Sequence, residues 1–103
     1  MAHIFTTTEI AAFSFDGTEI KIAAIVDTNG WMDTSYQVTV TEGEYTVSKH
    51  TNNGDTLQGG LAAYLAHDVK VNGVDKWTAD RVAFCFGLAA RRLNTMTVKA
   101  IAA

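Results

Sequence analysis

Apolar and polar residues alternate along residues 35–50, on both sides of Glu42-Gly43. This period of two is typical of a β-strand with one buried face, so the stretch predicts a β-hairpin. A shift of the strand pairing by one residue would expose every valine to solvent, so the pattern decides which face is buried. With a two-residue turn at Glu42-Gly43, the pairs expected on that face are Val40 with Tyr45 and Val38 with Val47.

A second hairpin is predicted over residues 10–26, around Asp16-Gly17. Aspartate followed by glycine is a preferred pair for a two-residue turn. Residues 3–7 are expected to form a short edge strand before it. The pairs that this hairpin predicts are Phe13 with Ile20 and Ala11 with Ile22, so that aromatic and β-branched side chains meet across the strands.

The two hairpins are joined by residues 27–34, in which Asn29-Gly30 has the sequence of a third tight turn. A two-residue loop there would place Tyr36 and Val38 on the wrong face of the sheet. We therefore expect a longer loop or a bulge. The tip of this loop carries the apolar pair Trp31-Met32.

After residue 52 the pattern changes from a period of two to helical spacing. Asp55 or Thr56 can cap a helix. Gly59-Gly60 weakens that helix by roughly 1 kcal/mol per glycine relative to alanine, and close packing against the sheet is the expected reason for these glycines. The apolar residues at helical spacing are Leu57, Leu61, Tyr64 and Leu65.

A second helix is predicted from Thr78, its cap, to Asn94, after a connector at 68–76 with a possible small hairpin at Asn72-Gly73. Trp77 is expected to pack on Val82 in front of the cap. The apolar stripe of this helix consists of Val82, Cys85, Phe86, Ala89 and Leu93, widened by Phe84 and Leu88. A helix this apolar should be the central core helix.

Arg91-Arg92 would lie in the last turn of this helix, where positive charge is favourable with the helix dipole. Thr95–Ile101 then reads as a last strand that returns to the sheet. Strands followed by helices favour an α+β fold. We predict a single α+β domain over 1–103, with an antiparallel β-meander of four to five strands, two helices packed on one face and a C-terminal return strand.

Composition narrows the functional classes. The chain has 103 residues and a formal net charge of −3, so no direct nucleic-acid binding is expected. A single cysteine excludes an internal disulfide. The longest apolar run, 82–90, is too short to span a bilayer. The first residues lack the pattern of a signal peptide, so an intracellular, cytoplasmic location is expected and no membrane partner.

No catalytic set is apparent, and we expect neither an enzyme nor a cofactor or metal. Cys85 lies between Phe84 and Phe86, where burial would raise its pKa and make it inert. The histidines at 3, 50 and 67 do not form a ligand pair at helical spacing. The glycine-rich stretch 54–60 opens a helix, which is a setting for anion binding. It lacks the lysine of a P-loop, and Asp55 would repel a phosphate.

The functional hypothesis therefore rests on features of the protein surface. In a meander the turns at Asp16 and at 42–44 lie at the same end of the sheet and form an acidic rim, while the Trp31-Met32 loop lies at the other end. Tryptophan and methionine are enriched at interface cores, although Trp31 could equally fold back and cap the core. The predicted partner-binding residues are Trp31, Met32, Asp33, Asp16, Glu42 and Glu44.

The leading hypothesis is a non-enzymatic protein-binding module that occupies the surface of another protein. Small acidic chains of this type are common among accessory proteins of phages and mobile elements, including inhibitors of host defence. One alternative is a structural subunit, for example of a phage particle, that self-associates or forms a homodimer through a sheet edge, either the N-terminal strand or 95–101. A second alternative is a small-ligand or anion binder at 54–60. No motif is specific enough to name a family.

Overall fold

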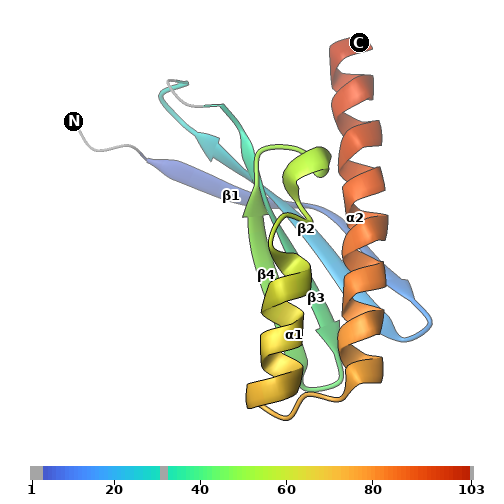
Figure 1. Cartoon of the computed structure of the whole chain (residues 1–103). Helices are drawn as coiled ribbons and strands as arrows, with labels where there is room; N and C mark the ends of the chain where they lie inside the picture. Colours follow the sequence, from blue (N-terminus) through green and yellow to red (C-terminus); the bar gives the residue numbers. More distant parts are fainter. Residues whose placement is uncertain (1–3, 31–32, 103) are drawn as a thin grey trace.

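A computed structural model describes residues 4–30 and 33–102, with side chains through Met96 (Figure 1). It has four strands and two α-helices, with a short 3-10 helix, η1, between them. In chain order the elements are β1 (Phe5–Phe15), β2 (Thr18–Asp27), β3 (Ser35–Glu42), β4 (Tyr45–Thr51), η1 (Gly54–Thr56), α1 (Leu61–Val71) and α2 (Lys76–Ala102).

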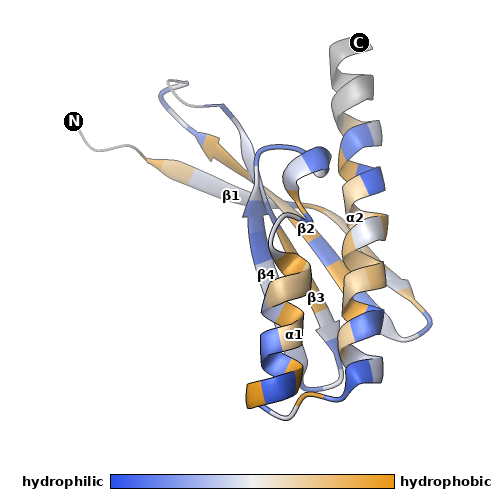
Figure 2. Ribbon diagram, in the orientation of Figure 1, coloured by the Kyte–Doolittle hydropathy of each residue, from blue (hydrophilic) through white to orange (hydrophobic). Residues whose placement is uncertain are grey.

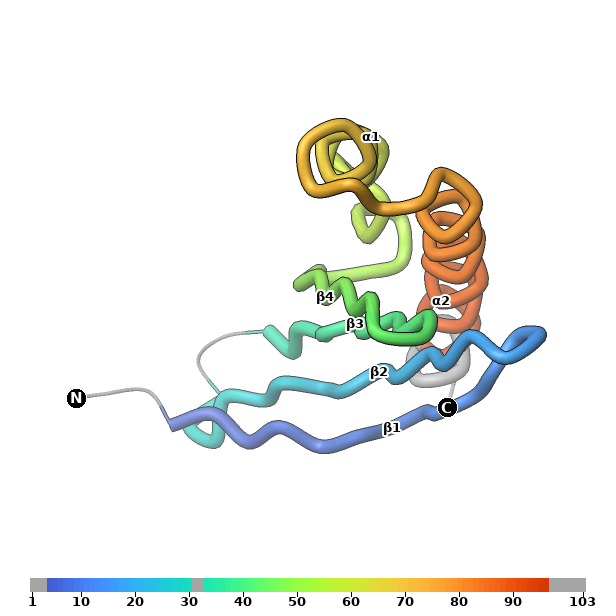
Figure 3. The backbone as a smooth tube through the Cα atoms, turned by 90° about the horizontal axis from the view of Figure 1, so that it is seen from below, coloured from blue at the N-terminus to red at the C-terminus, as the bar shows by residue number. Residues whose placement is uncertain are grey.

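The strands form one antiparallel sheet in the order β1-β2-β3-β4. Both helices lie on the same face of this sheet, as the view in Figure 3 shows. The α+β class, the four-stranded meander and the two helices on one face are therefore confirmed. The fold has two layers, and the core lies between them.

The first hairpin has the register that the sequence predicts. Phe13 pairs with Ile20 and Ala11 with Ile22, around a turn at Asp16-Gly17. The expected short strand at 3–7 is not separate: residues 5–7 belong to β1, which continues through a bulge between Glu9 and Ala11. The bulge lets one long strand keep both of its ends paired with β2.

The second hairpin has the predicted faces, but the predicted pairing is wrong by two residues. Val40 pairs with Val47, so the turn consists of Gly43 and Glu44. Glu42 stays in β3, where its carboxylate accepts a hydrogen bond from Thr18, and Gly43 takes the left-handed conformation with φ of 61°. A shift of two residues preserves every face, so alternation alone could not detect it.

The connection between the hairpins is longer than a tight turn, as expected. Ala24 pairs with Tyr36 and Ile22 with Val38, so the apolar residues of β2 and β3 share the helix-facing side. Trp31 and Met32, at the tip of this connection, lie outside the described residues.

The first helix begins later than predicted. Residues 54–56 form η1, capped by the Asn53 side chain, which accepts from the Thr56 amide at 3.0 Å. The α-helix starts only at Leu61, after Gly60 with φ of 74°. The expected close packing at Gly59-Gly60 is therefore wrong, since Gly60 serves a left-handed turn.

The close approach occurs at Gly54 instead. A Cβ atom there would lie 2.3 Å from the carbonyl oxygen of Ala90 in α2. The backbone of η1 therefore packs directly on the backbone of α2 at this point. The adjacent Asn94 side chain donates to Asp55 at 3.1 Å, which holds η1 on α2.

The second helix is longer at both ends than predicted. It begins at Lys76, and the Asp75 side chain, rather than Thr78, accepts from the Trp77 amide at 3.2 Å. It does not end at Asn94, and the predicted return strand over 95–101 is wrong because these residues continue α2 to Ala102. The small hairpin considered for residues 68–76 does not form, because α1 extends to Val71.

The prediction of a strand over 95–101 failed for a physical reason. Methionine, lysine and alanine are good helix formers, and no glycine or proline stops the helix after Asn94. The hydroxyl of Thr95 donates to the Arg91 carbonyl at 3.0 Å, which is how a β-branched polar residue is accommodated inside a helix.

The core follows the predicted stripe of α2. Phe86 and Cys85 are fully buried, and burial raises the pKa of the Cys85 thiol. In Figure 2 orange, apolar stretches alternate with blue, polar ones along the strands and both helices. The other members include Val82, Ala89 and Leu93 from α2, Ile20 and Ile22 from β2, and Val38 and Val40 from β3.

A polar network attaches α1 to the second hairpin. The Tyr45 hydroxyl donates to the buried Asp68 carboxylate, and the Asn72 side chain donates to the same carboxylate at 2.8 Å. These hydrogen bonds, that from Tyr45 first, lower the pKa of Asp68. The network therefore favours the ionised form of Asp68 in the folded state.

We expect Tyr45→Phe to destabilise the protein most at neutral pH. Because the pKa of Asp68 is lower in the folded than in the unfolded state, its contribution is complete above the unfolded value of about 4 and is lost as pH falls through the folded value. The stability difference between the two proteins should therefore shrink under acid conditions. Urea melts across the acid range measure this, and a difference independent of pH would contradict the assignment.

Candidate functional site

A second row of side chains runs along α2, beside the core stripe. Trp77, Arg81, Phe84, Leu88 and Arg92 recur at helical spacing and so lie on one side of the helix. Among the strands, α2 packs against β3 and β2, so the outer strand β1 lies to one side of the helix. The space between this row and β1 is only partly filled and contains two surface hollows.

At one end of this space is an aromatic cluster, which we define as Phe15, Trp77 and Phe84. The rings of Phe15 and Phe84 are 4.9 Å apart. Their residues are 40% and 53% exposed, and Trp77 is 58% exposed. The three surround a shallow hollow of about 260 Å³ that also includes Asp80 and Arg81. Large aromatic surfaces are thus gathered in one place and left open to solvent.

Arg81 fixes the geometry of the cluster. Its guanidinium lies 4.9 Å from the Trp77 ring and 5.8 Å from that of Phe15. It also forms an ion pair of 2.7 Å with Asp16 and donates to the buried Thr18 hydroxyl at 2.9 Å. The hydrogen bond with Asp16 is the main cause of the raised pKa of Arg81. The cation therefore clamps α2 to the first turn and lies near both rings.

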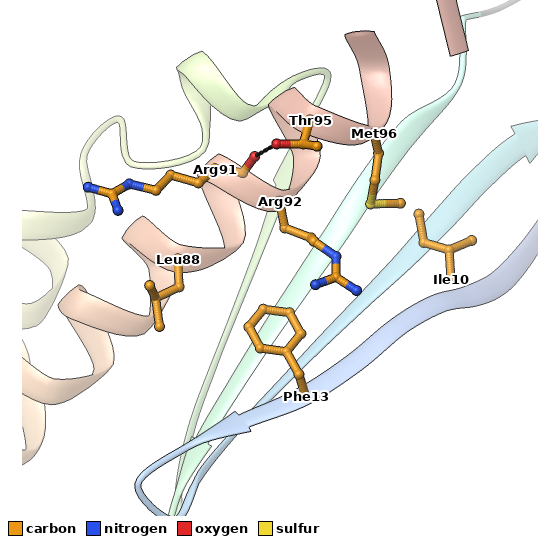
Figure 4. A pocket seen from close by; sticks show the side chains of 7 residues that line it. All are labelled: Ile10, Phe13, Leu88, Arg91, Arg92, Thr95 and Met96. Atoms are coloured by element: carbon orange, nitrogen blue, oxygen red, sulfur yellow. Dashed lines mark hydrogen bonds between the residues drawn. The ribbon is translucent and has the colours of Figure 1, made fainter. Parts of the chain in front are cut away.

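At the other end lies the β1–α2 groove, an open hollow of about 790 Å³. Figure 4 shows the Arg92 side chain reaching toward β1, while that of Arg91 extends away from Phe13 and Ile10. The guanidinium of Arg92 lies 5.3 Å from the Phe13 ring. The residues that line the groove are Ile10, Phe13, Leu88, Arg91, Arg92, Thr95 and Met96.

The two arginine sites differ in charge balance. Besides Asp16, Arg81 has Glu42 at 3.4 Å. In the described part of the chain, neither Arg91 nor Arg92 has a carboxylate within ion-pair distance. The groove is therefore locally cationic in an acidic protein, whereas the aromatic cluster is bordered by the exposed carboxylates of Asp16 and Asp80.

The structure brings some of the predicted site residues together. Asp16 and Glu42 share Arg81, which places the two turns at the same end of the sheet. The Glu42 side chain is only 21% exposed and pairs with Arg81, so it stabilises the fold and contributes little to an exposed acidic rim. Glu44 is exposed in the turn, and Asp33 is exposed in the distant connection. Trp31 and Met32 lie outside the described residues.

The aromatic cluster was not predicted from the sequence. Trp77 was expected to pack in front of the helix cap and Phe84 to widen the core stripe, yet both side chains are exposed. The available signal was the spacing of four and then three residues through Trp77, Arg81 and Phe84, which defines a second face of the same helix. Its proximity to Phe15 depends on the sheet and could not be read from α2.

The stretch 54–60 is less suited to an anion than its glycine content indicates. The amides of Leu57, Gly59 and Leu61 already donate to backbone carbonyls. The Lys49 ammonium is used as well, as it donates to the Gly59 carbonyl. An anion bound to these three amides would have to displace existing hydrogen bonds, which disfavours this alternative.

Among the described residues, no three histidine, cysteine, aspartate or glutamate side chains are grouped so as to hold a metal ion. None of the helices described has the length and apolar character needed to cross a membrane. Comparisons with family models, curated proteins and solved structures found no match to this chain.

Proposed function

We propose that this protein is a non-enzymatic binding module that docks on another protein through the aromatic cluster. The supporting observation is the exposure of Phe15, Trp77 and Phe84 around one clamped arginine. Tryptophan and arginine are the residue types most enriched among interface hot spots. Exposed aromatic side chains gathered in one place are typical of interaction sites rather than of an inert surface.

The partner surface should combine apolar side chains with basic ones. Two exposed carboxylates border the aromatic cluster: that of Asp16, 77% exposed and paired with Arg81, and that of Asp80, 67% exposed and paired with the exposed Lys76. Glu44, in the turn that follows Glu42, adds a further exposed carboxylate at this end of the sheet. Charges around an aromatic centre mainly steer encounter and discriminate between partners.

We expect Trp77→Ala to weaken partner binding by about 2 kcal/mol, or roughly thirtyfold, with little loss of stability. Trp77 is more than half exposed in the free protein, so folding does not depend on burying it. Affinity capture from a lysate of the source organism, followed by titration calorimetry with the purified partner, measures this effect.

Tyr64→Ala is the matched control, because Tyr64 is a similarly exposed aromatic residue, 53% exposed, on α1. A partner that both wild type and Tyr64→Ala bind, and that Trp77→Ala binds weakly, supports the proposal. Equal binding by all three proteins would mean that the aromatic cluster does not bind the partner. A captured protein that does not bind in purified form does not count as support.

A structural subunit that assembles through its sheet edge is the second candidate, and the exposed apolar residues of β1 favour it. Light scattering distinguishes the two candidates, since a stable large assembly of the purified chain would favour the structural subunit. The cytoplasmic location and the narrower role as a phage or mobile-element inhibitor stay predictions.

A further inference from the structure

The outer strand β1 has the features of a pairing edge. It is 11 residues long and, in the described chain, pairs with β2 alone. It contains no proline or lysine, the residues that commonly protect an edge, and Glu9 is its one charged residue. Its exposed residues include Phe5, Ile10 and Phe15. The opposite edge, β4, has only seven residues and includes Lys49 and His50.

The charge of the adjacent β1–α2 groove needs an explanation. In the last turn of a helix, Arg91 and Arg92 would be favoured by the helix dipole, but α2 continues to Ala102, almost three turns further. The dipole effect is confined to about the last turn, so it does not account for them. With no carboxylate at ion-pair distance among the described residues, the Arg92 guanidinium over Phe13 is available to an anionic group.

We propose that β1 and the β1–α2 groove bind an extended segment of a partner protein that contains apolar and acidic residues. The segment adds to the edge of β1 as a further strand. Its alternate side chains face the groove, where an apolar one packs between Phe13 and Leu88 and a carboxylate pairs with Arg92. This inference rests on the proposed binding function and names the class of partner segment.

The test uses short synthetic peptides with leucine or phenylalanine at alternate positions and a central glutamate, glutamine or lysine. We expect the glutamate peptide to bind at least about tenfold more tightly than the lysine peptide, because a carboxylate meets Arg92 and an ammonium is repelled. Arg92→Gln should abolish the preference for glutamate over glutamine. Lys70→Gln, which removes a positive charge from an exposed position on α1 outside the groove, is the control and should retain it.

Backbone methylation tests the strand itself. Alternate amides of an extended peptide point to the same edge, so methylation of one set should block pairing with β1, and methylation of the other set should not. Equal loss with either set, or no loss with both, would overturn strand addition. No detectable binding of any peptide, or equal binding of the glutamate and lysine peptides, would overturn the acidic-segment assignment.

Two further outcomes separate this inference from the proposed function. If the peptides fail while a Trp77-dependent partner is still captured, the proposed function stands and the inference is overturned. If light scattering shows a dimer that Arg92→Gln weakens, a second copy of the chain occupies the groove, which also overturns a separate partner segment. Thermal melts confirm that each variant is folded before it is compared.

Discussion

Phe86→Ala is expected to cost about 3 to 5 kcal/mol of folding free energy, the usual range for emptying a buried aromatic site. Phe86 is the largest fully buried side chain of the described residues and lies between α2 and the sheet. A typical domain is stable by about 5 to 15 kcal/mol, so this one change removes a large part of the total. Denaturant melts monitored by circular dichroism measure the loss.

Phe84→Ala provides the matched control within the same helix. Phe84 is 53% exposed and contacts Phe15 at the surface, so its truncation should cost no more than about 1 kcal/mol. Similar losses for both variants would mean that α2 does not present the face that the structure assigns to the core. A loss below about 1 kcal/mol for Phe86→Ala would contradict its central position outright.

The predictions that succeeded rest on periodicity. Alternation identified the buried faces of β2, β3 and β4, and helical spacing identified the core stripe through Cys85 and Phe86. These patterns arise from the burial of one face of an element, so they predict correctly which face is buried. They carry no information on shifts of two residues, which is why the pairing of Val40 was predicted with Tyr45 rather than Val47.

The errors at element ends have a different cause. The start of α1 depends on the left-handed Gly60, and the extension of α2 past Asn94 depends on the absence of a strong stop signal. Helix boundaries reflect small differences in local free energy, which a single sequence does not resolve. The return strand failed because a mixed stretch of threonine, methionine, lysine and alanine fits either period.

The candidate site shows a third limit. Phe15 and Phe84 are far apart in the sequence, and their contact is produced by the position of β1 beside α2. Arg81 and Arg92 also look alike in the sequence, because nothing local indicates that Arg81 is neutralised while Arg92 is not. Long-range proximity therefore decides the chemistry of the surface, and only the fold provides it.

The contact of Gly54 with α2 leaves no room for a larger side chain. A Cβ atom at position 54 would lie 2.3 Å from the Ala90 carbonyl oxygen and 2.4 Å from the Asn94 side chain. The first of these atoms belongs to the backbone, so no rotamer change relieves the clash. We expect Gly54→Ala to cost about 3 kcal/mol, at the upper end of the usual range for overpacking. It should also separate η1 from α2 and expose the fully buried Leu57.

Gly87→Ala is the control, because it adds the same methyl group to α2 where the nearest atom beyond the helix is the side-chain Nε2 of Gln58 at 3.6 Å. It should stabilise the protein by up to about 1 kcal/mol, since alanine is favoured over glycine inside a helix. Urea melts measure both variants, and hydrogen exchange at Leu57 and Gly59 reports whether η1 opens. If Gly54→Ala were as stable as wild type, with unchanged exchange at these amides, the backbone contact between η1 and α2 would be wrong, and α2 would have to lie further from this end of the sheet.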